Sequence, residues 1–129
     1  MAQTDPSIGD GAFPAAESSA GSVAMTESDA AVILTVTGAL DLALAPKLQH
    51  LFERAARLRP AVVVIDLSGL DFLASAGMAV LVRAHRQVPR GTELRVVAEG
   101  RRTLRPLELT RLTDELSVFP TLSAALAGG

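Results

Sequence analysis

VVVIDLSGLDFLASAGM, residues 62–78, is the stretch that decides the fold of this chain. Its first part is a run of β-branched residues that ends in an acid, which predicts a buried strand over Ala61–Asp66. A short polar link follows, and then a long apolar pattern predicts a helix over Ser75–Val88. The strand therefore delivers one hydroxyl, that of Ser75, to the start of a helix. A serine in this position has two possible roles. It caps the helix, or it forms, together with the backbone amides and the helix dipole, a site that is better suited to carrying a phosphate group than to catalysing hydrolysis.

The segments on both sides alternate between strand and helix patterns. The first two strands form a hairpin, and Gly38 is expected to end the second of them; the following helix has Pro46 in its first turn and stops before Pro60. The remaining predictions are strands over Ser22–Thr26, Ala31–Thr37, Glu93–Ala98 and Ser117–Phe119, and helices over Gly100–Leu109 and Thr121–Ala127. This order predicts a single α/β domain, in which about four helices pack on a mixed central sheet of four or five strands.

Composition sets the limits of the domain and excludes several classes of function. Residues 1–20 are small and polar and are expected to form a disordered tail, which leaves 21–129 as the domain. The chain has a net charge of −2 and no basic stretch longer than Arg101-Arg102, which argues against a nucleic-acid partner. It has no cysteine, no secretory signal and no apolar run long enough to enter a membrane, so a cytoplasmic protein is expected.

The sequence offers no constellation of residues for catalysis. His85 follows Ser75 by ten residues on one predicted helix, about 15 Å along its axis, and His50 is remote in sequence. Both histidines are expected on solvated helix faces. Asp66 is expected to accept backbone amides at a strand end, and no acidic loop surrounds it and Asp71 to hold a metal. Without a phosphate-binding loop either, the sequence predicts no enzyme, no metal and no cofactor.

Two motifs resemble the STAS domains of bacterial anti-sigma factor antagonists. Gly38-Ala39-Leu40-Asp41 followed by Ala45-Pro46-Lys47-Leu48 is similar to that family's Gly-Glu-Leu-Asp and Thr-Ala-x-x-Leu pattern. Residues 66–78 resemble its Asp-Leu-Ser…Phe-x-Asp-Ser-Ser-Gly-Leu segment. The resemblance covers roughly residues 22–127 and implies a STAS-like fold, with Gly38 and Asp66 in structural positions.

The resemblance also implies a function in which this chain is a switch rather than a catalyst. The family's phosphorylated serine falls on Ser75, and the unphosphorylated form binds an anti-sigma factor and so releases a sigma factor. The anti-sigma factor is often a serine kinase of histidine-kinase-like ATPase fold, so ATP and magnesium belong to the partner. The docking surface is expected to centre on an Asp71–Gly77 loop and the following helix, and to comprise Asp41, Asp71, Phe72, Ala74, Ser75, Ala76, Gly77 and Met78.

Three positions depart from the family pattern. Ala74 stands where the family has an aspartate, Ala76 replaces its second serine, and Leu44 replaces the threonine at the start of the first helix. Loss of the acid leaves three alternatives: a poor kinase substrate, a constitutive binder, or a substrate of a kinase with different requirements. A further alternative is a divergent STAS subunit of another complex, a signalling scaffold or a lipid-transport assembly, without a phospho-switch.

Overall fold

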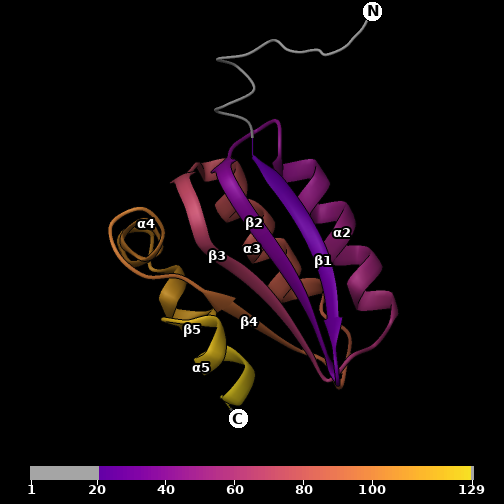
Figure 1. Ribbon diagram of the computed structural model, residues 1–129. Helices are drawn as coiled ribbons and strands as arrows, with labels where there is room; N and C mark the ends of the chain where they lie inside the picture. The colour runs from indigo at the N-terminus through magenta and orange to yellow at the C-terminus, as the bar shows by residue number, and fades with distance from the viewer. Residues whose placement is uncertain (1–20, 129) are drawn as a thin grey trace, which may run out of the picture.

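The computed structural model describes residues 21–128, which form one sheet with helices on both of its faces (Figure 1). Residues 1–20, the predicted tail, lie outside the described residues. The elements in chain order are β1 (Ser22–Ser28), β2 (Ala31–Leu40), α2 (Ala45–Arg57), β3 (Val62–Leu73), α3 (Ser75–Gln87), β4 (Glu93–Val97), α4 (Leu104–Leu109), a 3-10 turn (Leu112–Asp114), β5 (Ser117–Phe119) and α5 (Leu122–Ala127).

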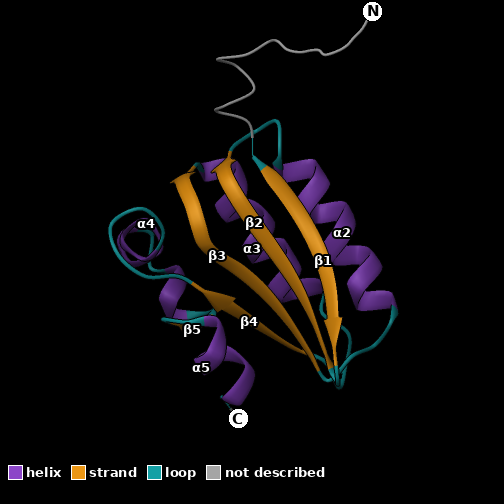
Figure 2. Cartoon of the chain, in the orientation of Figure 1, coloured by secondary structure: helices purple, strands orange, loops and turns teal. Residues whose placement is uncertain are grey.

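The sheet is mixed, as predicted, and its strands follow the order β1-β2-β3-β4-β5 (Figure 2). β1 pairs with β2 in an antiparallel hairpin, whereas β2, β3, β4 and β5 pair in parallel. The carboxyl ends of the parallel strands therefore share one edge of the sheet, which is where ligands and partners of open α/β sheets commonly bind. The predicted fold class, a single α/β domain with a mixed sheet of four or five strands, is confirmed, and the sheet has five strands.

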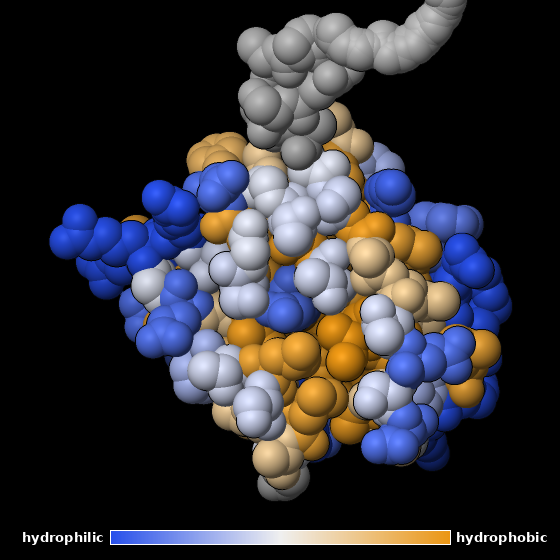
Figure 3. Space-filling view, viewed as in Figure 1, coloured by the Kyte–Doolittle hydropathy of each residue, from blue (hydrophilic) through white to orange (hydrophobic). Residues whose placement is uncertain are grey.

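The two faces of the sheet are covered unequally. α2 and α3 lie side by side on one face and enclose the main core, while α5 covers part of the other face (Figure 1). Figure 3 shows this second face, where hydrophobic residues gather in the lower half, paler residues lie above them, and strongly hydrophilic residues lie along both sides. The largest fully buried side chains belong to the main core and include Leu34, Leu40, Leu48, Phe52, Ile65, Leu67, Leu81 and Leu107.

β2 and β3 are both longer than the sequence patterns predicted. Gly38 does not end β2: it lies inside the strand with φ of +80°, next to a shift in the register between β2 and β3. The predicted polar link after Asp66 is likewise strand, because β3 continues beside β2 to Leu73. Two register shifts keep Leu67, Leu70 and Leu73 buried although their spacing of three does not match the period of a regular strand.

The observed helices match the predicted ones more closely than the strands do, with one exception. α4 begins at Leu104 instead of Gly100, because the Thr103 hydroxyl bonds both the amide and the carbonyl of Glu99 and holds a turn there. Pro106 is the third residue of α4, where the absence of an N–H is tolerated. α3 is continuous from Ser75 to Gln87, and both histidines are exposed, as expected.

Candidate functional site

The candidate site lies where β2 and β3 end side by side. Ala39 is paired with Phe72 and Leu40 with Leu73 in the parallel ladder. The Ala74 amide then donates a 2.9 Å hydrogen bond to the Leu40 carbonyl, which extends the pairing by one step. The loop that follows β2 and the helix start that follows β3 therefore leave the sheet next to each other, as the sequence predicted for Asp41 and Ser75.

Ser75 is exposed and is the first residue of α3, not its cap. The cap position belongs to Ala74, which is extended (φ −86°, ψ 166°) and provides no side-chain hydrogen bond. The predicted capping role of Ser75 is wrong because a serine caps from the residue before the first helical one. As the first residue of α3, Ser75 lies at the positive end of the helix dipole.

Gly77 fixes the first turn of α3 against the end of β2. A Cβ at this position would lie 2.5 Å from Leu40 Cγ and 3.0 Å from the Leu40 carbonyl oxygen, so only glycine allows this approach. Ala76 and Met78 on either side are half-buried, and the Thr110 hydroxyl lies 3.7 Å from the Met78 sulfur. Ser75 is thus carried by a turn that tight packing holds in place.

Asp41 organises the turn that leads into α2. Its Oδ1 accepts hydrogen bonds from the amides of Ala43 (3.2 Å) and Leu44 (3.1 Å), and its carbonyl accepts one from the Ala45 amide at 2.9 Å. The carboxylate is half-buried and engaged within its own loop. The same turn leaves the neighbouring Leu42 side chain 78% exposed.

Two large apolar side chains therefore reach solvent near Ser75: Leu42 from the loop after β2, and Phe72, 57% exposed, from the end of β3. Leu42 was not among the predicted docking residues, although a leucine between Asp41 and Ala43 in a turn could have been recognised from the sequence as an exposed apolar side chain. Asp71 forms an exposed ion pair with Arg102, whose Nη1 lies 3.4 Å from Asp71 Oδ1. Nothing local in the sequence indicates that pairing, because the two residues are 31 positions apart.

The expected Asp71–Gly77 loop does not exist as a loop. It consists of the last three residues of β3, the single junction residue Ala74 and the first turn of α3. Asp66, predicted at a strand end, lies inside β3 and is buried, where its Oδ1 accepts hydrogen bonds from the amide (3.0 Å) and the hydroxyl (2.7 Å) of Ser68. Residues 71–77 therefore belong almost entirely to regular secondary structure.

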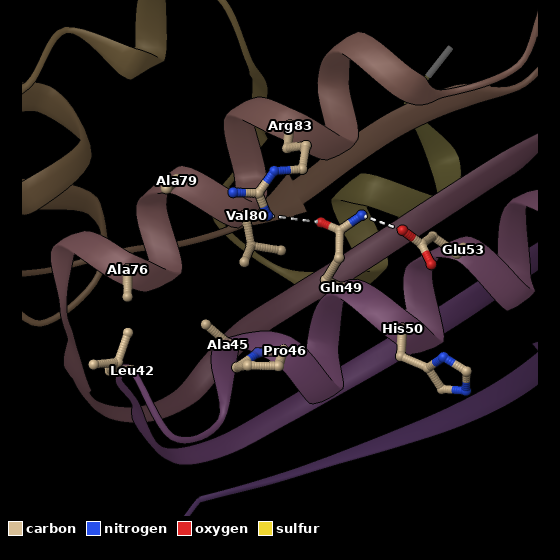
Figure 4. Close-up of a pocket in the computed structure, with 10 residues that line it drawn as sticks. All are labelled: Leu42, Ala45, Pro46, Gln49, His50, Glu53, Ala76, Ala79, Val80 and Arg83. Atoms are coloured by element: carbon tan, nitrogen blue, oxygen red, sulfur yellow. Dashed lines mark hydrogen bonds between the residues drawn. The ribbon is translucent and has the colours of Figure 1, made fainter.

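A groove of about 510 Å³ opens between α2 and α3 and begins beside the Ser75 turn (Figure 4). Leu42 and Ala76 lie at one end of it, and Glu53 and Arg83 lie toward the other. Gln49 connects the polar residues: its Oε1 accepts from Arg83 Nη1 at 3.3 Å, and its Nε2 donates to Glu53 Oε2 at 2.8 Å. The lining is completed by Ala45, Pro46, His50, Ala79 and Val80.

The described part of the chain offers neither a metal site nor a membrane-spanning helix. Within residues 21–128, no three His, Asp or Glu side chains gather in a way that could hold a metal ion. None of the helices in that range is long and apolar enough to span a bilayer.

A family model for the STAS domain matches residues 22–125. The chain belongs to the STAS domain family. This STAS domain is 32% identical over 106 residues to the anti-sigma-F factor antagonist RsfB of Mycobacterium tuberculosis, a match that covers 82% of the chain and 87% of the relative. It is 33% identical over 120 residues to the anti-sigma-F factor antagonist RsfA of the same species, a match that covers 91% of the chain and 94% of the relative.

Solved structures agree with this assignment. An anti-sigma factor antagonist from Mycobacterium paratuberculosis superposes with a TM-score of 0.80 at 31% identity, covering 84% of this STAS domain and 93% of that chain. The unphosphorylated form of SpoIIAA, an anti-sigma factor antagonist, superposes with a TM-score of 0.67 at 13% identity, covering 81% of this STAS domain and 93% of that chain. At that identity the match shows a similar fold and nothing more. The resemblance that the two sequence motifs indicated is therefore confirmed.

Proposed function

We propose that this STAS domain is an anti-sigma factor antagonist, which binds an anti-sigma factor and thereby releases a sigma factor. The support comes from relatives of that name that are about one-third identical over most of both chains. The single observation that carries the proposal is the exposed Ser75 on the rigid first turn of α3, at the sheet end where Leu42 and Phe72 are also exposed. The protein acts by binding, and any ATP and magnesium belong to its partner, a cytoplasmic serine kinase of histidine-kinase-like ATPase fold.

The docking surface is the area around Ser75. Leu42 and Phe72 supply apolar area, and exposed large apolar groups next to a polar centre are typical of protein interfaces. The backbone of this area is held by the β2–β3 ladder, the Asp41 turn and the contact of Gly77 with Leu40. A partner therefore meets a preformed surface and does not have to order a loop, which reduces the entropic cost of binding.

Phosphorylation of Ser75 switches this surface off. A phosphate adds about −1.5 to −2 charges at pH 7, and the helix start tolerates them, so the fold survives modification. The partner, in contrast, meets a bulky dianion in the middle of its contact. Ala74 leaves no acid immediately before the serine, so a kinase that modifies Ser75 does so without that acid.

Calorimetric titration of the cognate anti-sigma factor tests both parts of the proposal. Ser75→Ala removes only a hydroxyl and is expected to bind like the wild type. Ser75→Glu brings a charge into the contact and is expected to weaken binding by about 30-fold or more. Ser123→Glu is the matched control, because Ser123 is an exposed serine in the first turn of another helix, α5.

The outcomes separate the switch from the function. Equal affinity of Ser75→Glu and the wild type would place Ser75 outside the contact and overturn the switch. Absence of binding by the wild type, with scaffold or transporter subunits recovered from the cell instead, would overturn the antagonist function. Incubation with the anti-sigma factor and ATP, followed by mass spectrometry, is expected to add one phosphate to the wild type and none to Ser75→Ala.

A further inference from the structure

The layer formed by α2 and α3 is strongly basic in a chain whose net charge is −2. Segments 45–59 and 75–90, which contain these helices, hold seven of the 12 Lys and Arg residues and a single acid, Glu53. All seven bases are exposed: Lys47, Arg54, Arg57, Arg59, Arg83, Arg86 and Arg90. The concentration arises only on folding, because in sequence these bases are spread over more than forty positions.

The bases on the two helices line the rims of the α2–α3 groove. On α2, Lys47, Arg54 and Arg57 recur with His50 at intervals of three or four residues, so they form one stripe along the helix. His50 itself lines the groove, which places this stripe along its edge. On α3, Arg83 lines the groove, and Arg86 follows three residues later on the same side.

These charges are not neutralised within the described structure. Between residues 21 and 128, the ion pairs involve Arg95, Arg102, Arg105 and Arg111, and none involves a base of the α2–α3 layer. The one acid of the layer, Glu53, already accepts a hydrogen bond from Gln49. Seven bases against the single acid Glu53 leave this layer with an excess of positive charge, which favours an anionic partner.

We propose that the α2–α3 groove binds an acidic amphipathic helix of the anti-sigma factor, an inference that rests on the proposed function. The apolar face of that helix fills the floor formed by Ala45, Ala76 and Val80, and its acids meet the basic rims. Ala76 directly follows Ser75, so the groove continues the docking surface without a break. The partner thereby contacts the switch and the groove at once.

The shape of the groove favours a protein helix over other anionic partners. Its floor is recessed and made of short side chains, which accept protruding side chains of a helix, whereas a bilayer or a duplex presents a smoother surface. The lining has no Phe, Tyr or Trp, the side chains that stack on bases of single-stranded nucleic acids. An acidic helix satisfies both the apolar floor and the basic rims.

The test is surface plasmon resonance of the immobilised cognate anti-sigma factor against full-length variants at low and high NaCl. Arg54→Glu/Arg83→Glu reverses one rim charge on each helix and is expected to weaken binding by about tenfold or more at low salt, chiefly through slower association. Arg105→Glu/Arg111→Glu changes the net charge by the same amount as the groove variant, at one position on α4 and one just after it. This variant is expected to bind like the wild type. Equal melting temperatures confirm that each variant is folded.

A second variant tests the apolar floor independently of charge. Ala79→Gln places a long side chain in the groove without altering charge and is expected to weaken binding mainly through faster dissociation. His85→Gln, an exposed substitution on the same helix, is its control.

Each outcome decides the inference. Loss of affinity in both groove variants, with both controls unchanged, supports it. Groove variants that bind like the wild type, while Ser75→Glu does not, overturn the groove inference and leave the proposed function standing. A wild type that does not bind overturns both. If charge reversal instead abolishes binding to phosphatidylglycerol vesicles or duplex DNA and spares the anti-sigma factor, the groove serves a membrane or a nucleic acid and the inference is wrong.

Discussion

At the residue scale, the position of Ser75 depends on the absence of a side chain at Gly77. The first turn of α3 rests directly on Leu40, which is completely buried at the end of β2. A Cβ there overlaps both the side chain and the backbone of Leu40. The helix cannot retreat without breaking the hydrogen bond from the Ala74 amide to the Leu40 carbonyl. One close contact therefore sets where the Ser75 hydroxyl lies relative to the ends of β2 and β3.

Gly77→Ala is expected to lower the free energy of unfolding by about 1–3 kcal/mol, because overpacking outweighs the gain in helix propensity. Urea denaturation measures the change. Gly69→Ala is a suitable comparison, since the nearest atom to its Cβ would be a methyl group of Thr37 at 3.1 Å and the nearest backbone atom would be the Val36 carbonyl oxygen at 3.6 Å. If Gly77→Ala were as stable as the wild type, the first turn of α3 would be less tightly held than the structure indicates.

Asp41 is a second residue whose role is local. Asp41→Ala removes the acceptor of two amide hydrogen bonds and is expected to cost about 0.5–2 kcal/mol of unfolding free energy. Asp41→Asn keeps an acceptor oxygen and is expected to retain most of that stability. Thermal melts of both variants distinguish the two contributions: equal losses in the two would mean that the charge, and not the turn, is what matters.

At the scale of elements, the helices differ in what holds them to the sheet. α2 and α3 are each 13 residues long and pack into the main core, whereas α5 has six residues and covers a small cluster on the other face. A helix that short is not stable by itself. Buried Arg95 on β4 attaches it: Nη1 donates a 2.6 Å hydrogen bond to the Ala125 carbonyl, and the guanidinium lies 5.8 Å from the centre of the Phe119 ring.

Arg95→Met keeps an apolar stem of similar length and removes the donor to Ala125. The amides of α5 are expected to exchange faster with deuterium, with a loss of about 1–3 kcal/mol in local stability. Hydrogen exchange read by mass spectrometry on peptides from 120–128 and from β2 gives the comparison. Protection that is unchanged in 120–128 would mean that apolar contacts alone hold α5; a loss shared equally with β2 would mean global, not local, destabilisation.

At the scale of the whole molecule, the described residues 21–128 by themselves supply two hydrophobic clusters. Residues 1–20 offer only Ile8 and Phe13 as large apolar side chains. A chain of residues 21–129 is therefore expected to fold like the full-length protein, because it keeps the buried apolar surface that stabilises the fold. Two-dimensional NMR of both chains checks this, and collapse of amide dispersion in the shorter one would show that the domain begins earlier.

The whole molecule is also expected to have no catalytic activity of its own toward ATP. Ser75 has no base within reach on its own helix, and the sequence has no phosphate-binding loop. Purified protein with ATP and magnesium is expected to release no phosphate above the buffer and to remain unlabelled. Steady phosphate release that disappears in Ser75→Ala would contradict this.

The sequence by itself determined the order of the elements, the mixed sheet, the family and the serine at the start of α3. These depend on local periodicity and on short motifs, in which neighbours in the chain are also neighbours in space. The prediction from sequence was wrong where strand pairing overrides the local pattern. Residues 67–73 were predicted to be a link between strand and helix, yet β2 pairs with them and keeps them in the sheet. It was also wrong about the cap, which depends on where the backbone turns.

Only the tertiary structure decided which surfaces the chain presents. The pairing of Asp71 with Arg102 and the approach of Gly77 to Leu40 join residues more than thirty positions apart. The basic layer is the clearest case: the sequence shows scattered bases in a slightly acidic chain, but two helices packed side by side bring seven of these bases into one layer, which contains the groove. Charge density and concavity depend on where residues lie in space. They cannot be read from the order of residues in the sequence until the fold is known.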